Sequence, residues 1–123
     1  MKAVVALSIL VLSSAVSAEA FDCNEDELDW ECANRESVHV EAELNATYQS
    51  LLRRLATSEI PEERESRSLL VAAQRLCVSF READCDASDA FQSSGTSRAA
   101  LAVSCRVQHA KLRIEQLNRF GQP

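Results

Sequence analysis

Residues Gln74–Cys85 read QRLCVSFREADC, and this stretch decides the predicted fold of the chain. Its apolar side chains recur at intervals of three and four residues, which is typical of an amphipathic helix. Cys85 closes the stretch, and Cys105 follows twenty residues later. A helix that ends in a cysteine, followed by a second cysteine at this distance, favours two antiparallel helices joined by a disulfide. We therefore work outward from a helical hairpin.

The apolar pattern of this stretch extends toward the N-terminus and predicts a helix over about residues 62–85. Pro61 suits the first turn of that helix, because its missing N–H would have no partner there. We expect the buried stripe of this helix, including Phe80 as a core residue, to consist of Leu70, Ala73, Cys77, Phe80 and Asp84, widened by Leu69 and Leu76.

Two further helices are predicted on either side of the central one. The earlier helix carries an apolar stripe formed by Val40, Leu44, Tyr48, Leu51, Leu52 and Leu55. The later helix, capped by Thr96 or Ser97 and ended by Gly121, carries the stripe Ala100, Val103, Val107, Ala110, Ile114 and Leu117. Polar connections are expected over residues 57–61 and 86–95.

A short extra helix is predicted at the N-terminal side, opening at Asn24 with Glu27 completing a capping box. The apolar pattern lapses over residues 33–37, where we expect a kink or break. The chain has only two glycines and two prolines, so few residues interrupt long helices. The predicted fold class is all-α: a small antiparallel bundle of three main helices plus a short N-terminal helix, with two disulfides.

Residues 1–20 have the features of a secretory signal peptide. Lys2 precedes the apolar run AVVALSILVL, and small residues follow, with cleavage expected after Ala18 or Ala20. The run is too short to span a bilayer. We therefore expect a single domain over residues 21–123 that is periplasmic or secreted and does not insert into a membrane.

Charge is unevenly distributed along this chain, whose formal net charge is −6. Nine acidic residues and the single base Arg35 lie between Asp22 and Leu52, whereas residues 90–123 hold five basic residues and only Glu115 as an acid. The acidic N-terminal half favours a cationic protein partner and argues against nucleic acid.

The five cysteines of an exported chain indicate two disulfides and one free thiol. Cys77 and Cys85 lie about 12 Å apart along one helix, too far for a bridge. Cys85 can face Cys105 across the helical hairpin, and Cys23 can pair with Cys32 if it lies outside the helix and folds back along it. Cys77 remains as the free thiol, which we interpret as a small buried hydrophobic residue.

No pattern of catalytic or metal-binding residues stands out in the sequence. His39 and His109 are isolated and match no ligand spacing, and a catalytic pair of Cys77 with His109 has no support from neighbouring residues. The sequence also has no Cys-x-x-Cys motif and no phosphate-binding loop. We predict a binding protein without cofactor or metal rather than an enzyme.

The spacing of several residues resembles the lysozyme inhibitor LprI-like family of exported bacterial proteins. The positions that carry the resemblance are Cys23, Cys32, Leu44, Asn45, Tyr48, Ala73, Gln74, Phe80, Arg81, Cys85, the loop glycine, Cys105, Arg113 and Leu117. The chain departs from the family pattern at Cys77, where the family usually has Trp, at Glu41, often Asp, and at Ala110, often Thr.

The resemblance implies an all-helical, disulfide-linked domain of the cell envelope, with lysozyme binding known for a member. Lysozymes are often strongly basic and work through a cleft with two carboxylates. An acidic partner would be steered toward such an enzyme. We therefore expect this protein to bind and inhibit a cationic lysozyme. The alternative is a structural or stress-related envelope protein without an enzyme target, dimeric through Cys77.

Two segments are candidates for partner binding. The first is the acidic run from Asp22 to Glu31, with Asp26, Glu27, Asp29 and the aromatic anchor Trp30; its other interpretation is a solvated helix start. The second is the loop after Cys85, with Phe91, Ser94 and Gly95, which is equally consistent with a plain connection.

The remaining family positions are interpreted as structural. We expect Arg81 and Arg113 to pair with acids across the bundle, for example Glu41 or Asp84, although both could also bind an anion. Leu44, Asn45, Tyr48 and Gln74 are expected to fix helix packing.

Overall fold

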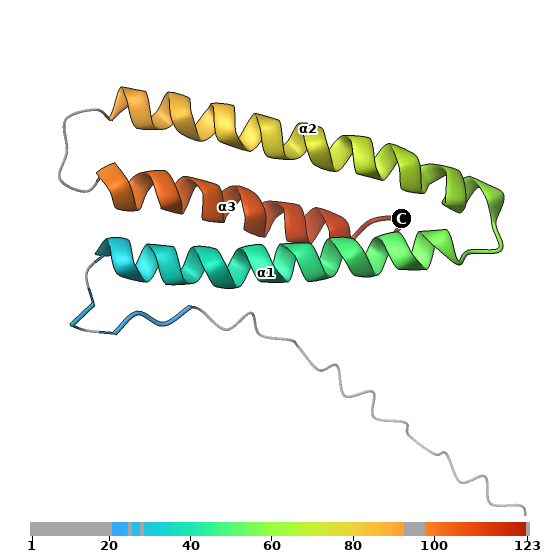
Figure 1. Cartoon of the computed structure of the whole chain (residues 1–123), viewed down its shortest axis with the longest axis horizontal. Coiled ribbons are helices and arrows are strands. Elements are labelled where there is room, and N and C mark those ends of the chain that lie inside the picture. The colour runs from blue at the N-terminus through green and yellow to red at the C-terminus, as the bar shows by residue number, and fades with distance from the viewer. Residues whose placement is uncertain (1–20, 25, 28, 93–97, 123) are drawn as a thin grey trace, which may run out of the picture.

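The protein is a bundle of three long helices, shown in Figure 1. The computed structural model describes residues 21–24, 26, 27, 29–92 and 98–122, so the predicted signal peptide lies outside the described residues. The helices are α1 (Asp29–Ala56), α2 (Pro61–Phe91) and α3 (Arg98–Asn118), and the described residues contain no strand. Each helix runs antiparallel to the one before it. The all-α fold with three main helices and two disulfides is confirmed.

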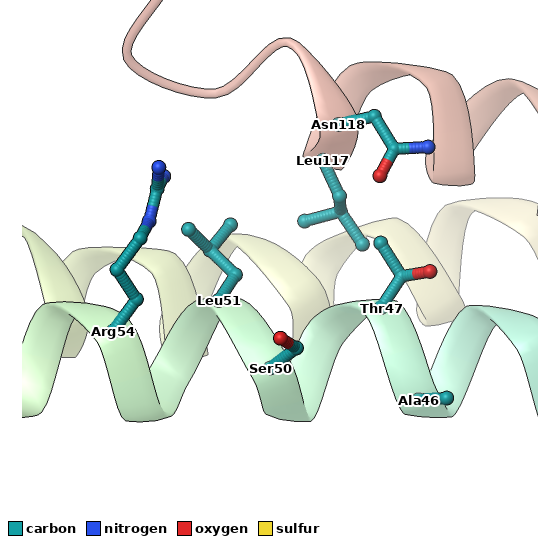
Figure 2. Close-up of a pocket in the computed structure, with 7 residues that line it drawn as sticks. All are labelled: Ala46, Thr47, Ser50, Leu51, Arg54, Leu117 and Asn118. Atoms are coloured by element: carbon teal, nitrogen blue, oxygen red, sulfur yellow. The ribbon is translucent and has the colours of Figure 1, made fainter.

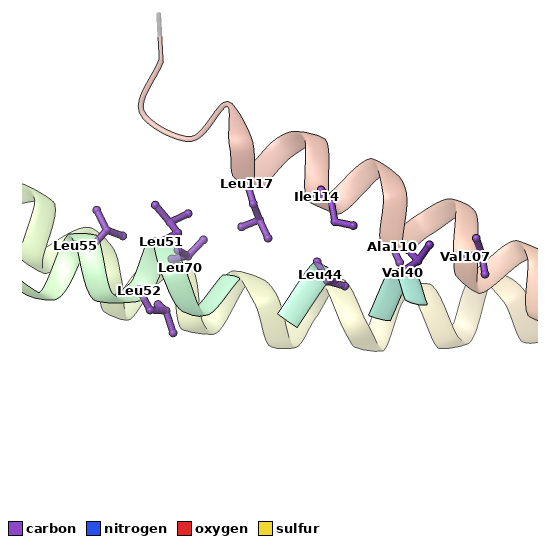
Figure 3. Close-up of a cluster of buried hydrophobic side chains, with 10 residues drawn as sticks. All are labelled: Val40, Leu44, Leu51, Leu52, Leu55, Leu70, Val107, Ala110, Ile114 and Leu117. Carbon is purple, nitrogen blue, oxygen red and sulfur yellow. The ribbon is translucent and has the colours of Figure 1, made fainter. Parts of the chain in front are cut away.

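The core lies mainly between α1 and α3, which make the largest contact between helices. Figure 3 shows its buried side chains projecting from both helices, with a single contribution from α2. They are Val40, Leu44, Leu51, Leu52 and Leu55 of α1, Leu70 of α2, and Val107, Ala110, Ile114 and Leu117 of α3. The apolar stripes predicted for the first and third helices are therefore confirmed, with Tyr48 and Val103 partly buried at their edges.

The stripe predicted for α2 is wrong in most of its members. Leu70 is buried, but Phe80 is 61% exposed, Leu69 66% and Leu76 72%, and Ala73 is exposed as well. The half-buried side of α2 is rotated away from this stripe and presents Val71, Gln74, Cys77, Arg81 and the fully buried Cys85. Cys77 is consequently half-buried, not buried as expected. With only two other helices in the bundle, α2 has one covered side.

The break expected over residues 33–37 is also wrong, because α1 continues through them without interruption. Ala33 is buried there although its neighbours are polar. Residues 24–27 form a hydrogen-bonded turn in which the Asn24 N–H donates to Glu27 Oε2 at 3.2 Å. This is one half of the predicted capping box, but α1 begins only at Asp29. The short extra helix was predicted over residues that include 25 and 28, which lie outside the described part.

The central helix is longer than predicted at its C-terminal end, where α2 continues to Phe91 and the expected loop began at residue 86. Two ion pairs hold this extension: Asp86 accepts from Arg106 at 3.0 Å, and Asp89 accepts from Arg98 at 2.6 Å. The extension is therefore stabilised by arginines of α3, which composition alone does not reveal.

The other helix ends follow the prediction. Pro61 occupies the first turn of α2, and Gly121 has a positive φ of 75° beyond the end of α3. The expected caps Thr96 and Ser97 lie outside the described residues. Among the helices described, none combines the length and apolar character needed to cross a membrane.

Candidate functional site

Both disulfides lie at one end of the bundle, which we call the disulfide end. It consists of the described residues between 21 and 35, α2 from Glu82 onward and α3 up to Arg106. Figure 1 shows the start of α1, the end of α2 and the start of α3 meeting there. The described parts of the two segments predicted for partner binding, the start of α1 and the end of α2 with Phe91, therefore lie at the same end of the bundle.

The first disulfide joins Cys23 to Cys32, with their Cα atoms 5.6 Å apart. Cys23 lies outside α1 and is exposed, whereas Cys32 is the fourth residue of α1 and is buried. Residues 21–24 thus fold back along α1, as the pairing required. The bond fixes the acidic segment to the body of the bundle.

Arg35 is a second tie between that segment and α1. Its guanidinium donates to both carboxylate oxygens of Glu27, at 3.1 and 2.7 Å, and to the main-chain oxygen of Asp22 at 3.0 Å. It also lies over the ring of Phe21, 4.7 Å from the centroid. One side chain therefore holds three residues of the segment, by hydrogen bonds and a cation–π contact.

Glu27 is engaged inside the protein through this contact. The hydrogen bonds from Arg35 hold the pKa of Glu27 below its usual value, and its side chain is 12% exposed. In contrast, Asp26 and Asp29 are exposed and, within the described residues, form no ion pair. Glu31 shares these properties. Among the described residues, Asp26, Asp29 and Glu31 are thus carboxylates free to meet a partner.

The arginines of the disulfide end do not offset these free acids. Arg35 is paired with Glu27, Arg98 with Asp89, and Arg106 with both Glu82 and Asp86. In each pair, hydrogen bonding raises the pKa of the arginine. The acids of the N-terminal segment therefore give this end an uncompensated negative charge.

Two large aromatic side chains are exposed at the same end. Trp30, the second residue of α1, is 48% exposed, and Phe91, the last residue of α2, is 91% exposed. Exposed aromatic residues next to charges are common anchors of protein interfaces. The other two candidates from the sequence, Ser94 and Gly95, lie outside the described residues.

The second disulfide joins Cys85 to Cys105, with a Cα separation of 5.7 Å, and closes the α2–α3 hairpin. Polar contacts reinforce the hairpin on both sides of the bond. Arg98 donates to the two carboxylate oxygens of Asp89 at 2.8 and 2.6 Å, and Arg106 Nε donates to Glu82 at 2.9 Å. Phe91 therefore lies at a helix end that the disulfide and these ion pairs hold against α3.

The polar links formed by residues at family positions lie between the helices. Arg81 of α2 forms an ion pair with Glu41 of α1, and Arg113 of α3 donates to Gln74 of α2 at 2.8 Å. These side chains join α2 to both other helices. Of the remaining family positions, Leu44 is buried, Tyr48 is half-buried and Asn45 is exposed.

A shallow depression lies between these polar links and is lined in part by Cys77 and His109. The Nε2 atom of His109 lies 2.8 Å from Asp84 Oδ2, and its ring meets that of Phe80 edge-on, with centroids 5.6 Å apart. This histidine is therefore oriented by a carboxylate and an aromatic ring of α2.

Within the described residues, two groups of three side chains are spaced closely enough to hold a metal ion, and each group contains two cysteines. The groups are Cys85 and Cys105 with His109, and Cys23 and Cys32 with Glu27. In each group the two cysteines are joined in a disulfide, so neither sulfur is a thiolate ligand. These groups are best described as structural bridges.

An open groove of about 460 Å³ lies between α1 and α3, away from the disulfide end. Figure 2 shows its lining, in which Leu51 and Leu117 lie beside small polar side chains and Arg54. Arg54 donates to the main-chain oxygen of Phe120 at 3.3 Å. The groove has no exposed aromatic side chain among its lining residues and is a weaker candidate for protein binding.

Sequence reasoning missed the arginines that organise the disulfide end. Arg35 contacts residues eight and thirteen positions away, a spacing that no helical pattern predicts. For Arg106 a signal existed: Glu82 and Asp86 are four residues apart on one helix face and together offer a site for a cation.

Comparison with known proteins agrees with this architecture. The sequence model of the family described as lysozyme inhibitor LprI matches residues 22–117, which include α1, α2, all of α3 but its last residue, and both disulfides. No curated protein and no solved structure matches the chain. Because the match covers most of the sequence, this chain belongs to the LprI lysozyme inhibitor family.

Proposed function

We propose that this protein is exported and inhibits a cationic lysozyme by binding it through the disulfide end. The observation that carries the proposal is the set of free acids Asp26, Asp29 and Glu31 around the exposed Trp30, with the exposed Phe91 at the same end of the bundle. Membership of a family of inhibitors supports a binding role rather than an enzymatic one.

The charges of the disulfide end suit a strongly basic partner. Free carboxylates attract such an enzyme over a range of about 10 Å at moderate salt and speed its association. The exposed aromatic side chains would make the close contacts with the enzyme. Large aromatic residues that are buried on binding contribute much of the affinity of protein interfaces. The two disulfides hold both segments in place, so little entropy is lost when they dock.

The predicted signal peptide fits this role, because a lysozyme acts on the cell wall outside the cytoplasm. We propose that residues 1–20 direct export and that residues 21–123 form the mature, periplasmic or secreted domain. Both disulfides belong to an oxidising compartment.

The proposal is tested by following cell-wall lysis with lysozymes of the c, g and i types in the presence of the disulfide-intact protein. We expect dose-dependent inhibition of at least one basic lysozyme, weakened by Trp30→Ala or Phe91→Ala. The matched control is Leu112→Ala, since Leu112 is 57% exposed and lies on α3 away from the disulfide end. Lack of inhibition of every type at a large molar excess would reject the proposal.

A further inference from the structure

The outer side of α2 carries an apolar strip that the other helices leave largely exposed, apart from the edge-on contact of Phe80 with His109 of α3. Its three large members are the exposed Leu69, Leu76 and Phe80. Ala73 continues the strip between Leu69 and Leu76, and three further alanines continue it from Phe80 toward the helix end. The complete strip, all of it exposed, consists of Leu69, Ala73, Leu76, Phe80, Ala83, Ala87 and Ala90.

The spacing within this strip is that of a coiled-coil seam. Successive members are separated by four, three, four, three, four and three residues. Apolar residues that recur every 3.5 residues on average mark the a and d positions of a heptad, which pack against a second helix with the same pattern. The core of the monomer uses a different side of α2, through Leu70 and Cys85, so the strip is free for such a helix.

We propose that a second copy of this chain docks on the strip, so that two α2 helices pack antiparallel across a two-fold axis. The strip is about 32 Å long at ~1.5 Å per residue, and about 10 Å wide. An exposed apolar surface of roughly 300 Å² is in the range that marks an interaction site. Because α2 is already folded in the monomer, docking costs no helix formation. About 300 Å² from each copy lies well below the size of a stable interface, so we expect a weak, reversible dimer.

The order of large and small side chains in the strip is self-complementary when one helix is reversed. With the two-fold axis midway between the levels of Leu76 and Phe80, Leu76 packs against Phe80 of the second copy in two equivalent central layers. Ala73 then meets Ala83 of the second copy, and Leu69 meets Ala87. Every layer pairs an a with a d position, and the outer layers combine a large with a small side chain or two small ones, which lets the helices approach closely.

The flanking charges select the antiparallel direction. The C-terminal half of α2 has four acids, Glu82, Asp84, Asp86 and Asp89, and one base. A parallel pair would place these acids beside their own copies. An antiparallel pair places Arg75, exposed and without an ion pair in the described residues, near Glu82 and Asp86 of the second copy. Opposite charges attract in this arrangement, and like charges are kept apart.

Crosslinking through Cys77 can test this register. Cys77 follows Leu76, is half-buried and is the free cysteine of the chain. In the antiparallel register the two Cys77 side chains lie on the same flank of the seam and next to the two-fold axis. A short bismaleimide that spans about 10 Å, the separation of neighbouring helices, should therefore join them.

The test is sedimentation of the disulfide-intact protein from about 1 µM to about 1 mM, without any lysozyme present. We expect a monomer–dimer equilibrium that Leu76→Glu weakens at least about a hundredfold, because the charge would be buried at the centre of the seam. Val38→Glu on α1 is the matched control, since Val38 is 73% exposed and lies outside the strip. It should dimerise like the wild type.

Crosslinking through Cys77 decides the register. We expect a crosslinked dimer with the wild type and Val38→Glu, and none with Cys77→Ser or Leu76→Glu. A wild type that stays monomeric over the whole concentration range would overturn the proposal, as would a Leu76→Glu variant that dimerises normally. A dimer that the bismaleimide does not join would contradict the antiparallel register. None of these results depends on lysozyme inhibition.

Discussion

Arg81 of α2 is ion-paired with Glu41 of α1 although the Arg81 side chain is only 14% exposed. The same guanidinium also contacts Glu82, at 3.2 Å. A nearly buried arginine between two carboxylates acts as a fixed polar link, and it is the link that ties the least buried helix to α1. The sequence singled out both Arg81 and its partner.

Replacing Arg81 with methionine is expected to destabilise the fold by about 1 kcal/mol, because Glu41 and Glu82 lose a shared counter-ion while most of the packing is retained. Thermal unfolding followed by circular dichroism measures this change. Arg75→Met is the control, since Arg75 is exposed on the same helix and should alter stability far less.

Because Leu44 lies in the core and Leu76 does not, the same substitution should change stability by different amounts at the two positions. Leu44→Ala removes a side chain that is 6% exposed and should cost about 2–5 kcal/mol, whereas Leu76→Ala removes one that is 72% exposed and should cost less than about 0.5 kcal/mol. Urea unfolding at a concentration low enough to keep the chain monomeric provides the comparison. Equal losses would show that the outer strip of α2 belongs to the core.

The bridge between Cys85 and Cys105 should stabilise the hairpin by roughly 3 kcal/mol, since it restricts the unfolded chain. The double variant Cys85→Ala with Cys105→Ala is therefore expected to unfold at a clearly lower urea concentration. Cys77→Ser serves as control because Cys77 is in neither disulfide. A double variant as stable as the control would mean that the charge contacts around Arg98 and Arg106 hold the hairpin without the bond.

Stability should fall at low pH because three of the ion-paired carboxylates have lowered pKa values in the folded state. Hydrogen bonds from Arg35, Arg106 and Arg98 lower the pKa values of Glu27, Glu82 and Asp89, respectively, below the usual 4.5, 4.5 and 3.8. Groups with a lowered folded-state pKa stabilise the protein fully above the unfolded pKa, and this contribution is lost as the pH falls through the folded pKa.

The melting temperature should therefore be nearly constant between about pH 7 and pH 5 and should decrease below about pH 4.5. Glu82→Gln should melt lower than the wild type near neutral pH, and the difference should shrink in acid. A difference that is the same at pH 7 and pH 3 would exclude a contribution from ionised Glu82.

The stripes of α1 and α3 could be predicted from the sequence because each of these helices has one apolar side. In α2, apolar residues lie on two sides, and periodicity alone does not tell which side faces the bundle. Phe80 was therefore placed in the core, although the half-buried side presents Gln74 and Arg81 instead. Polar residues that link helices look like solvent-facing residues in a hydropathy pattern.

The candidate site was predictable in its parts but not in its assembly. Composition identified the acidic run around Trp30 and the aromatic Phe91, because each stands out locally. Their placement at one end follows from the directions of the three helices. The engagement of Glu27 by Arg35 depends on how residues 21–27 fold back, which the sequence pattern does not encode.

The central claim, that a cationic lysozyme binds the disulfide end, is tested most directly by comparing inhibition constants of two charge-matched variants. One combines Asp26→Asn, Asp29→Asn and Glu31→Gln, and the other combines Glu59→Gln, Glu62→Gln and Glu63→Gln at the opposite end. Each variant removes three exposed acids, and two of the three lie in the first turn of a helix. These are Asp29 and Glu31 of α1 in one variant and Glu62 and Glu63 of α2 in the other. We predict that the first variant inhibits about tenfold more weakly than the wild type, since three exposed charge contacts of ~0.5 kcal/mol sum to roughly 1.5 kcal/mol and a tenfold change corresponds to about 1.4 kcal/mol. The second should match the wild type. Equal inhibition constants for the two variants would contradict the claim.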